Sequence, residues 1–243
     1  MRPSDLAADE TVAFVLAHIA QPPLRILDVG CGAGLVARRL QARGYDVVAI
    51  DESTELVQQA RALGADARVA AWPSFADTPF DVVLFARSLH HIQPLAEAVA
   101  HAHRLLVSSG LVLVEDFAWV EIEPVTAEWF YGVVRLLTTC QVIVAKEDSF
   151  ATELARSGGA FAFWQQSHDH DLHTVTAMWA ALQTQFQSLS ETSAPDLYRY
   201  LCPAVAANEV GYAIVSQVLA MEQRLAHLGT LTLIGRRFVG RKR

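Results

Sequence analysis

The first half of the chain alternates between short apolar segments and segments with the apolar spacing of helices. The strand-like segments are 25–29, 46–50, 67–71, 80–85 and 110–114, and the helix-like segments are 4–20, 35–43, 53–63 and 94–106. Nearly continuous apolar strands that alternate with helices indicate a parallel sheet covered on both faces, with the short connections of a doubly wound α/β fold. Such sheets bind ligands beyond the carboxyl ends of their strands, so the residues after each strand are the first candidates for a site.

The second half of the chain is less regular. It contains helix candidates over 124–144, 174–186 and 206–228, a possible strand over 187–192, and an alternating segment over 230–238. The last of these is expected to pair antiparallel near the sheet edge. We expect one domain over 1–243, in which the segments near 118–172 and 194–229 form a helical cap over the strand ends.

Composition excludes several classes of protein. Of 243 residues, 52% are hydrophobic and only 19% are charged, which is not the composition of a disordered chain. The 26 acidic residues outnumber the 19 basic ones, and this balance disfavours a nucleic-acid partner. The three cysteines, Cys31, Cys140 and Cys202, are too widely spaced for a disulfide framework or a zinc pair. With no signal-like start and no membrane-length apolar run, a cytoplasmic protein without a membrane partner is expected.

The most informative motif is a glycine loop that follows the first predicted strand. Gly30, Gly32 and Gly34 lie in the sequence DVGCGAG of residues 28–34, where glycine lets the backbone turn sharply and approach a ligand. A dinucleotide fingerprint would need its third glycine at position 35, where Leu35 stands, so a nicotinamide-dependent dehydrogenase is disfavoured. Asp51 ends the next strand and could accept hydrogen bonds from ribose hydroxyls; the alternative is that it only caps the following helix.

These motifs together resemble the class I S-adenosylmethionine-dependent methyltransferases, closest to the small-molecule branch of the ubiquinone- and menaquinone-biosynthesis type. The resemblance covers residues 24–117 and rests on 27–34 (LDVGCGAG), 48–51 (VAID), 80–83 (FDVV), 88–92 (SLHHI) and 104–110. It implies a Rossmann-like, doubly wound, mostly parallel seven-stranded sheet with an antiparallel C-terminal strand. It also implies S-adenosyl-L-methionine as cofactor and S-adenosyl-L-homocysteine as product.

The resemblance assigns roles in cofactor binding residue by residue. The glycines would pass under the methionine and ribose portions, and the backbone near Ala86 and Arg87 would accept from the methionine amino group. The complete cofactor set is Asp28, Gly30, Cys31, Gly32, Gly34, Asp51, Glu52, Ala71, Trp72, Ala86 and Arg87. Family members often carry an aspartate after the third strand, but residues 69–73 read VAAWP, so adenine is expected to be held by backbone groups and packing.

Methyl transfer from a sulfonium needs alignment and exclusion of water, and it needs a general base only where the acceptor must lose a proton. The candidates for such a role are His90, His91, Glu115, His168 and His170. Each has a structural alternative, either local hydrogen bonding or packing. The segment 168–173 (HDHDLH) could be a solvated loop that caps the next helix, a substrate-facing base or a metal site, and no metal is assigned.

The sequence therefore predicts a methyltransferase that acts on a small, partly apolar metabolite by O-, N- or C-methylation. The alternatives are a non-methylating enzyme of the cyclase type that uses the same cofactor, and a cofactor-binding regulatory subunit without catalysis. The apolar helices near 130–145 and 206–228 allow either a monomer or a homodimer.

Overall fold

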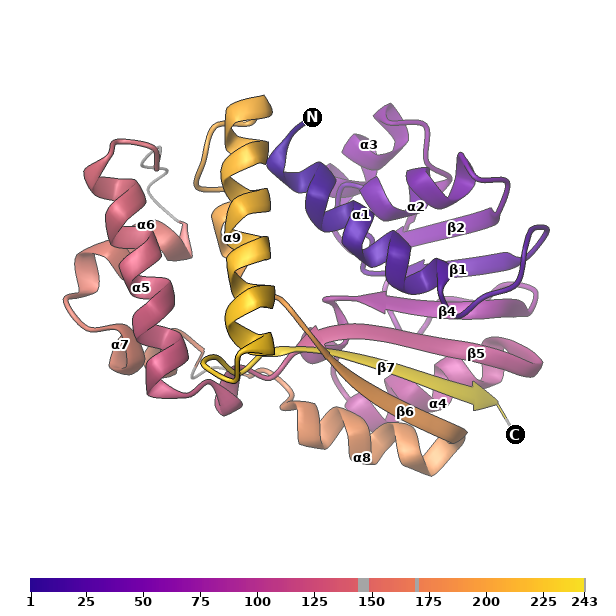
Figure 1. Ribbon diagram of the computed structural model, residues 1–243. Helices are drawn as coiled ribbons and strands as arrows, with labels where there is room; N and C mark the ends of the chain where they lie inside the picture. The colour runs from indigo at the N-terminus through magenta and orange to yellow at the C-terminus, as the bar shows by residue number, and fades with distance from the viewer. Residues whose placement is uncertain (144–148, 169–170, 243) are drawn as a thin grey trace. The chain divides into compact units, whose positions relative to one another are not determined.

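The computed structural model describes residues 1–143, 149–168 and 171–242. In this part of the chain, one sheet has the strand order β3-β2-β1-β4-β5-β7-β6. The first five strands pair in parallel, and β7 runs antiparallel to its neighbours (Figure 1). The strands are β1 (Arg25–Val29), β2 (Asp46–Asp51), β3 (Ala67–Val69), β4 (Phe80–Ala86), β5 (Leu106–Phe117), β6 (Phe186–Ala194) and β7 (Gly235–Lys242). The predicted fold class is confirmed.

The chain divides into two compact units. The sheet unit comprises Ala8–Asp116, His173–Thr192 and the C-terminal segment from Arg236. The helical unit comprises Met1–Ala7, Phe117–Leu172 and Ser193–Gly235. The helix α1 (Pro3–Leu16) contributes residues to both units.

The register of the parallel strands aligns their carboxyl ends. Val29 at the end of β1 pairs with Ile50 of β2 on one side and with Phe85 of β4 on the other. The residues that follow these three positions therefore emerge at the same edge of the sheet. This alignment brings the glycine loop after β1 and Asp51 at the end of β2 to one place.

Helices cover both faces of the sheet unit (Figure 1). Alternate strand residues, including Ile26, Val82 and Leu84, pack against α1, α2 (Leu35–Gln41) and α3 (Thr54–Ala62) on one face. The helices α4 (Leu95–Leu105) and α8 (Val175–Gln185) lie along the other face. Because strand side chains alternate between faces, strands covered on both sides must be apolar throughout, which is the pattern that the sequence displayed.

Strand β5 begins earlier than the sequence predicts, at Leu106 instead of Gly110. Its pairing with β4 shifts register between Phe80 and Val82, and Ser109 has φ of 63° within the irregularity. The sequence Ser-Ser-Gly at 108–110 is typical of a turn, but in the structure it forms a bulge within the continuous strand β5.

The helical unit has an apolar core of its own, in which Phe130, Trp164 and Leu201 are almost completely buried. Its elements are α5 (Pro124–Thr139), α6 (Phe150–Ser157), α7 (Ala160–Ser167), α9 (Glu209–His227) and the short helices η2 (Trp119–Glu121) and η3 (Leu197–Leu201). The sequence predicts helices over α5 and α9, but α6 and α7 were not predicted. The carboxylate of Glu222 on α9 is buried and accepts hydrogen bonds from the amides of Asp196 and Leu197 at 2.8 and 3.2 Å, which ties α9 to the start of η3.

Candidate active site at the carboxyl ends of the strands

A cavity of about 600 Å³ lies in the sheet unit beyond the carboxyl ends of β1, β2 and β4. This volume is in the range of small-molecule and cofactor sites. Its lining comprises Val29, Gly30, Gly32, Ile50, Asp51, Glu52, Leu56, Ala70, Trp72, Arg87, Ser88, His91, Ile92 and Gln93. The edge of the sheet where the cavity lies is the one that the sequence predicts for a ligand.

The three glycines of the loop are needed for different reasons. All three have a left-handed backbone, with φ of 72° at Gly30, 53° at Gly32 and 74° at Gly34. A Cβ on Gly30 would lie 2.5 Å from the Cβ of Ser88, so this glycine permits the loop to pack against the residues after β4. A Cβ on Gly32 would meet nothing within 4 Å, although Gly32 lines the cavity. The backbone is thus open to a ligand at Gly32.

Asp51 links the glycine loop to the start of α3. One carboxylate oxygen accepts from the amide of Gly32 at 2.9 Å, and the other accepts from the amide of Ser53, also at 2.9 Å. Ser53 is the residue that caps α3, because its hydroxyl accepts from the amide of Leu56. Each carboxylate oxygen has a second lone pair for a ligand, and Asp51 lines the cavity.

Asp28 lies beneath the loop in β1, and its side chain is buried. Among the described residues, neither carboxylate oxygen has a hydrogen-bond partner. Burial, together with the charge of Asp51, raises the pKa of Asp28 from 3.8 to about 7. Burial also raises the pKa of the Cys31 thiol, with smaller contributions from both aspartates, so this cysteine is held in its neutral form. A buried carboxyl without a partner beside a cavity is a common mark of a functional site.

Arg87 and Ser88 form the wall that follows β4. Arg87 has φ of 58°, which is uncommon for a residue with a side chain, and its amide donates to the carbonyl of Glu115 at 2.7 Å. The hydroxyl of Ser88 donates to the carbonyl of Val29 at 2.5 Å. These two bonds join the ends of β1, β4 and β5, and the strained backbone at Arg87 is typical of ligand-binding sites.

Of the predicted cofactor residues, Gly30, Gly32, Asp51, Glu52, Trp72 and Arg87 line the cavity. Asp28, Cys31, Gly34, Ala71 and Ala86 are not among the lining residues. Gly34 has a packing role, since a Cβ there would lie 2.6 Å from the Cβ of Ala60 on α3. The lining residues Leu56, Ile92 and Gln93 were not singled out from sequence, although their positions just after β2 and β4 were a usable signal.

The predicted catalytic residues have different environments. His91 is exposed and lines the cavity. His90, whose ring centroid is 4.1 Å from that of His91, is buried with its Nδ1 2.7 Å from a carboxylate oxygen of Asp116. Glu115 is buried away from the lining and pairs with Arg237 at 2.7 Å, while it also accepts from the hydroxyl of Thr11.

The remaining histidine candidates lie in the segment 168–173. In the helical unit, His168 is buried, with Nδ1 2.9 Å from the Trp164 carbonyl and Nε2 3.0 Å from the Tyr200 hydroxyl. In the sheet unit, the Nε2 of His173 lies 2.9 Å from the carbonyl of Ile92, and the hydroxyl of Thr174 caps α8. His170 lies outside the described residues. Among the residues that are described, no group of three or more His, Cys, Asp or Glu side chains could hold a metal ion.

The strand order with an antiparallel β7, the glycine loop after β1 and the acid at the end of β2 define the class I methyltransferase fold. Residues 27–114 match the family model described as a methyltransferase domain. Over these residues the chain is similar to the methyltransferase domain family, in agreement with the resemblance that the motifs show.

Curated relatives match the same region. The chain is 39% identical over 110 residues to a ubiquinone biosynthesis O-methyltransferase of Xanthomonas campestris pv. campestris (strain B100), covering 41% of this chain and 46% of that protein. It is 31% identical over 100 residues to a ubiquinone biosynthesis O-methyltransferase of Caulobacter sp. (strain K31), covering 37% of this chain and 40% of that protein. The chain therefore spans less than half the length of these relatives.

A solved structure resembles almost the whole chain. The plantazolicin methyltransferase, crystallised with a monoazolic desmethyl-plantazolicin analogue and S-adenosylhomocysteine, aligns with a TM-score of 0.53 at 15% identity, covering 99% of this chain and 83% of that one. At this identity the likeness establishes the fold.

Among the described residues, none of the helices is long and apolar enough to cross a membrane.

Proposed function

We propose that the protein transfers a methyl group from S-adenosyl-L-methionine to a small, partly apolar metabolite, releasing S-adenosyl-L-homocysteine. The observation that carries this proposal is the cavity in which the open backbone at Gly32 lies beside the carboxylate of Asp51. A cofactor with a ribose and a positively charged methionine portion suits this site, because Asp51 can accept from hydroxyls while Asp28 offers a buried negative charge nearby above its raised pKa of about 7.

The bound cofactor would supply an activated methyl group on its sulfonium sulfur. The chain's own residues then have the tasks of binding, orienting and excluding water. Asp51 would hold the ribose hydroxyls, with Glu52 beside it. Ala70, Trp72 and Leu56 form an apolar part of the lining that suits the adenine ring. Arg87 and Gln93 are polar lining residues that would contact an acceptor, together with His91.

For an acceptor that must lose a proton, we propose His91 as the base. It is the one predicted catalytic histidine or glutamate that lines the cavity among the described residues. His90 would act as a positioning residue, because its Asp116 partner holds the ring that lies against His91. Glu115 has a structural role in this proposal, since Arg237 and Thr11 occupy its carboxylate.

The names of the curated relatives support methyl transfer over a cyclase-type reaction or a non-catalytic subunit. We further propose a cytoplasmic enzyme, monomeric or homodimeric, with no nucleic-acid partner. The net charge of −7 supports the last point. The assignment of residues 118–172 and 194–229 to a cap over the strand ends also stays a proposal.

The experiment that tests the function is incubation of the protein with methyl-labelled S-adenosylmethionine and a cell extract fractionated by size. Label is expected in a small-molecule fraction and is expected to vanish with Asp51→Ala, because that change removes the group that organises Gly32 and would hold the ribose. Titration calorimetry with S-adenosylhomocysteine should show the same variant losing affinity at least tenfold. Unchanged affinity would refute the role of Asp51, and label in protein or RNA would refute the substrate class.

A further inference from the structure

The segment between β3 and β4, residues 70–79, forms part of the cavity wall without belonging to a helix or strand. Ala70 and Trp72 at its beginning line the cavity. An irregular segment keeps one shape only where specific bonds fix it, because it has no ladder of backbone hydrogen bonds to do so. The bonds that fix residues 70–79 therefore determine the shape of this wall.

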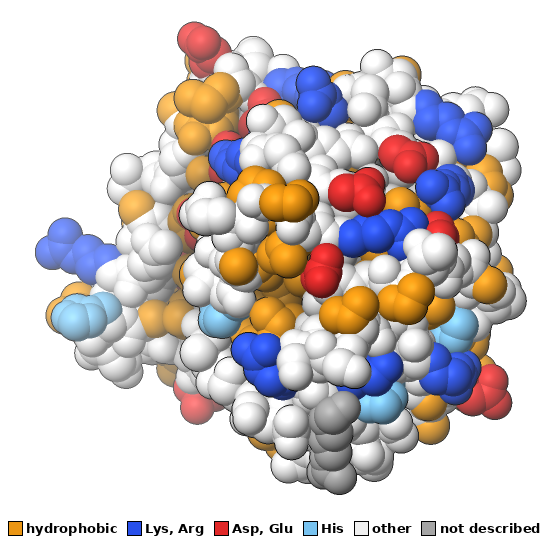
Figure 2. All heavy atoms as spheres, turned by 90° about the vertical axis from the view of Figure 1, so that its right-hand side faces the viewer, with side chains coloured by type: hydrophobic (Ala, Val, Ile, Leu, Met, Phe, Trp, Pro, Cys, Tyr) orange, Lys and Arg blue, Asp and Glu red, His pale blue; other side chains and the backbone are white. Residues whose placement is uncertain are grey.

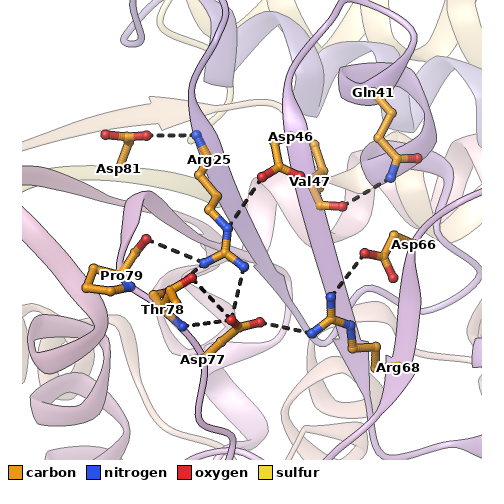
Figure 3. Close-up of polar contacts among 10 residues, drawn as sticks. All are labelled: Arg25, Gln41, Asp46, Val47, Asp66, Arg68, Asp77, Thr78, Pro79 and Asp81. Atoms are coloured by element: carbon orange, nitrogen blue, oxygen red, sulfur yellow. Dashed lines mark hydrogen bonds and ion pairs between the residues drawn. The ribbon is translucent and has the colours of Figure 1, made fainter.

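The far end of the segment is anchored at the amino ends of the strands. Asp77 accepts from Arg68 at 2.9 Å and pairs with Arg25 at 3.1 Å (Figure 3). Arg25 also donates to the carbonyl of Thr78. The surface seen on this side intersperses acidic and basic side chains (Figure 2). Although burial opposes it, the bonds from Thr78 and the two arginines lower the pKa of Asp77, so this anchor stays charged at neutral pH.

The middle of the segment is anchored by His101 on α4. Its Nε2 lies 2.6 Å from the carbonyl oxygen of Phe75, and its Nδ1 lies 3.0 Å from a guanidinium nitrogen of Arg104. A carbonyl only accepts and a guanidinium only donates, so the contacts require a proton on Nε2 and a bare Nδ1. Burial, assisted by the charge of Arg104, lowers the pKa of His101 and favours this neutral form.

The same histidine contacts the aromatic residue of the wall. The ring of His101 meets the indole of Trp72 edge-on, with centroids 4.5 Å apart and planes at 64°. One turn earlier on α4, the carbonyl of Ala98 accepts from the Trp72 indole nitrogen at 3.2 Å. Phe85 of β4 packs on Trp72 from another direction, at 5.7 Å. Because the only donor of its side chain is used, the Trp72 side chain can offer the cavity an apolar ring surface but no hydrogen bond.

We propose that His101 is a positioning residue for the cofactor's base: by holding the Phe75 carbonyl and the Trp72 ring, it fixes the wall against which the adenine packs. This inference rests on the proposed function. His101 itself is not among the residues lining the cavity, so its effect on binding passes through Trp72 and the segment 70–79. Residues 70–76 contain no acidic side chain, and Asp77 further on pairs with Arg68 and Arg25, so the shape of the apolar wall determines how tightly the base is held.

The test is titration of the full-length protein with S-adenosylhomocysteine and with adenosine. His101→Ala should weaken both ligands about tenfold, since both carry the base. His101→Gln should stay within threefold of the unaltered protein, because the glutamine amide nitrogen can replace Nε2 as donor to the Phe75 carbonyl. The matched control is His103→Ala on the same helix, where the ring packs against Phe186 of β6 at 5.7 Å; its affinities should be unchanged.

The outcomes separate this inference from the proposed function. If the unaltered protein binds neither ligand, the proposed function is wrong and this inference is wrong with it. If it binds, but a folded His101→Ala variant binds equally well, or His103→Ala loses as much, only the positioning role is refuted. Should His101→Ala fail to fold, His101→Phe takes its place, because it keeps a ring beside Trp72 but has no donor for Phe75. Weaker binding by His101→Phe than by His101→Gln supports the proposal, and equal binding overturns it.

Discussion

The buried carboxyl of Asp28 is expected to make the free energy of unfolding depend on pH. The pKa of Asp28 is raised from 3.8 to about 7, first by burial and then by the charge of Asp51. The folded state therefore holds this proton more tightly than the unfolded chain. The resulting contribution to stability is fully present below pH ~3.8 and is lost as the pH rises towards 7.

The magnitude follows from the difference between the two pKa values. At ~1.4 kcal/mol per pKa unit, ionising Asp28 in the folded protein costs about 4 kcal/mol. Asp28→Asn removes the ionisable group while keeping nearly the same shape. The variant should therefore gain stability relative to the unaltered protein as the pH rises, with the difference increasing from about 2 kcal/mol at pH 5 to about 4 kcal/mol at pH 8. A pH-independent offset is expected as well, since the new amide is itself buried.

The assay is urea denaturation of both proteins, without cofactor, at several pH values between 5 and 8. The quantity to compare is the slope of the free energy of unfolding with pH, because the constant cost of burying the amide does not affect this slope. A difference in the free energy of unfolding that stays constant over this range, or that moves in the opposite direction, would refute it. In a companion titration, Asp28→Asn should bind S-adenosylmethionine more weakly at pH 8, because it lacks the negative charge near the cationic cofactor.

Two further predictions concern the surroundings of the site. Arg237→Met leaves Glu115 buried without its cationic partner and should lower the free energy of unfolding by about 3 kcal/mol; in thermal and urea denaturation, a loss below about 1 kcal/mol would contradict a structural ion pair. Gly34→Ala should lower the free energy of unfolding by about 2 kcal/mol more than Gly229→Ala. Both glycines have φ near 70°, but only a Cβ at position 34 would lie 2.6 Å from the Cβ of Ala60. Equal losses of stability in the two variants would show that backbone strain alone decides the effect.

Local patterns carried the prediction of the sheet and of half of the site. Residues 25–29 were predicted as a strand with the observed bounds, because a short, mainly apolar run that ends at a glycine is typical of a buried strand. The proximity of Gly32 and Asp51 was predictable for a related reason. Both residues lie where a parallel strand ends, and the carboxyl ends of parallel strands lie at the same edge of the sheet. Strand β5 was less predictable, because its bulge at Ser109 depends on pairing with β4 and resembles a turn in sequence.

Only the tertiary structure distinguishes the environments of side chains that occupy similar positions near the ends of strands. Glu115 and His91 both lie near strand ends, but Glu115 pairs with Arg237, which is 122 residues away, while His91 lines the cavity. Nothing in the sequence distinguishes His101 from other residues of its helix, and its contact with the carbonyl of Phe75 appears only in the structure. The sequence by itself determined the α/β fold and the glycine loop with the acid at the end of the next strand, because these follow from periodicity and local backbone requirements. Which polar groups face the cavity and which are occupied elsewhere was decided by contacts between distant segments, because a buried charge or donor takes whatever partner the packed structure brings within reach.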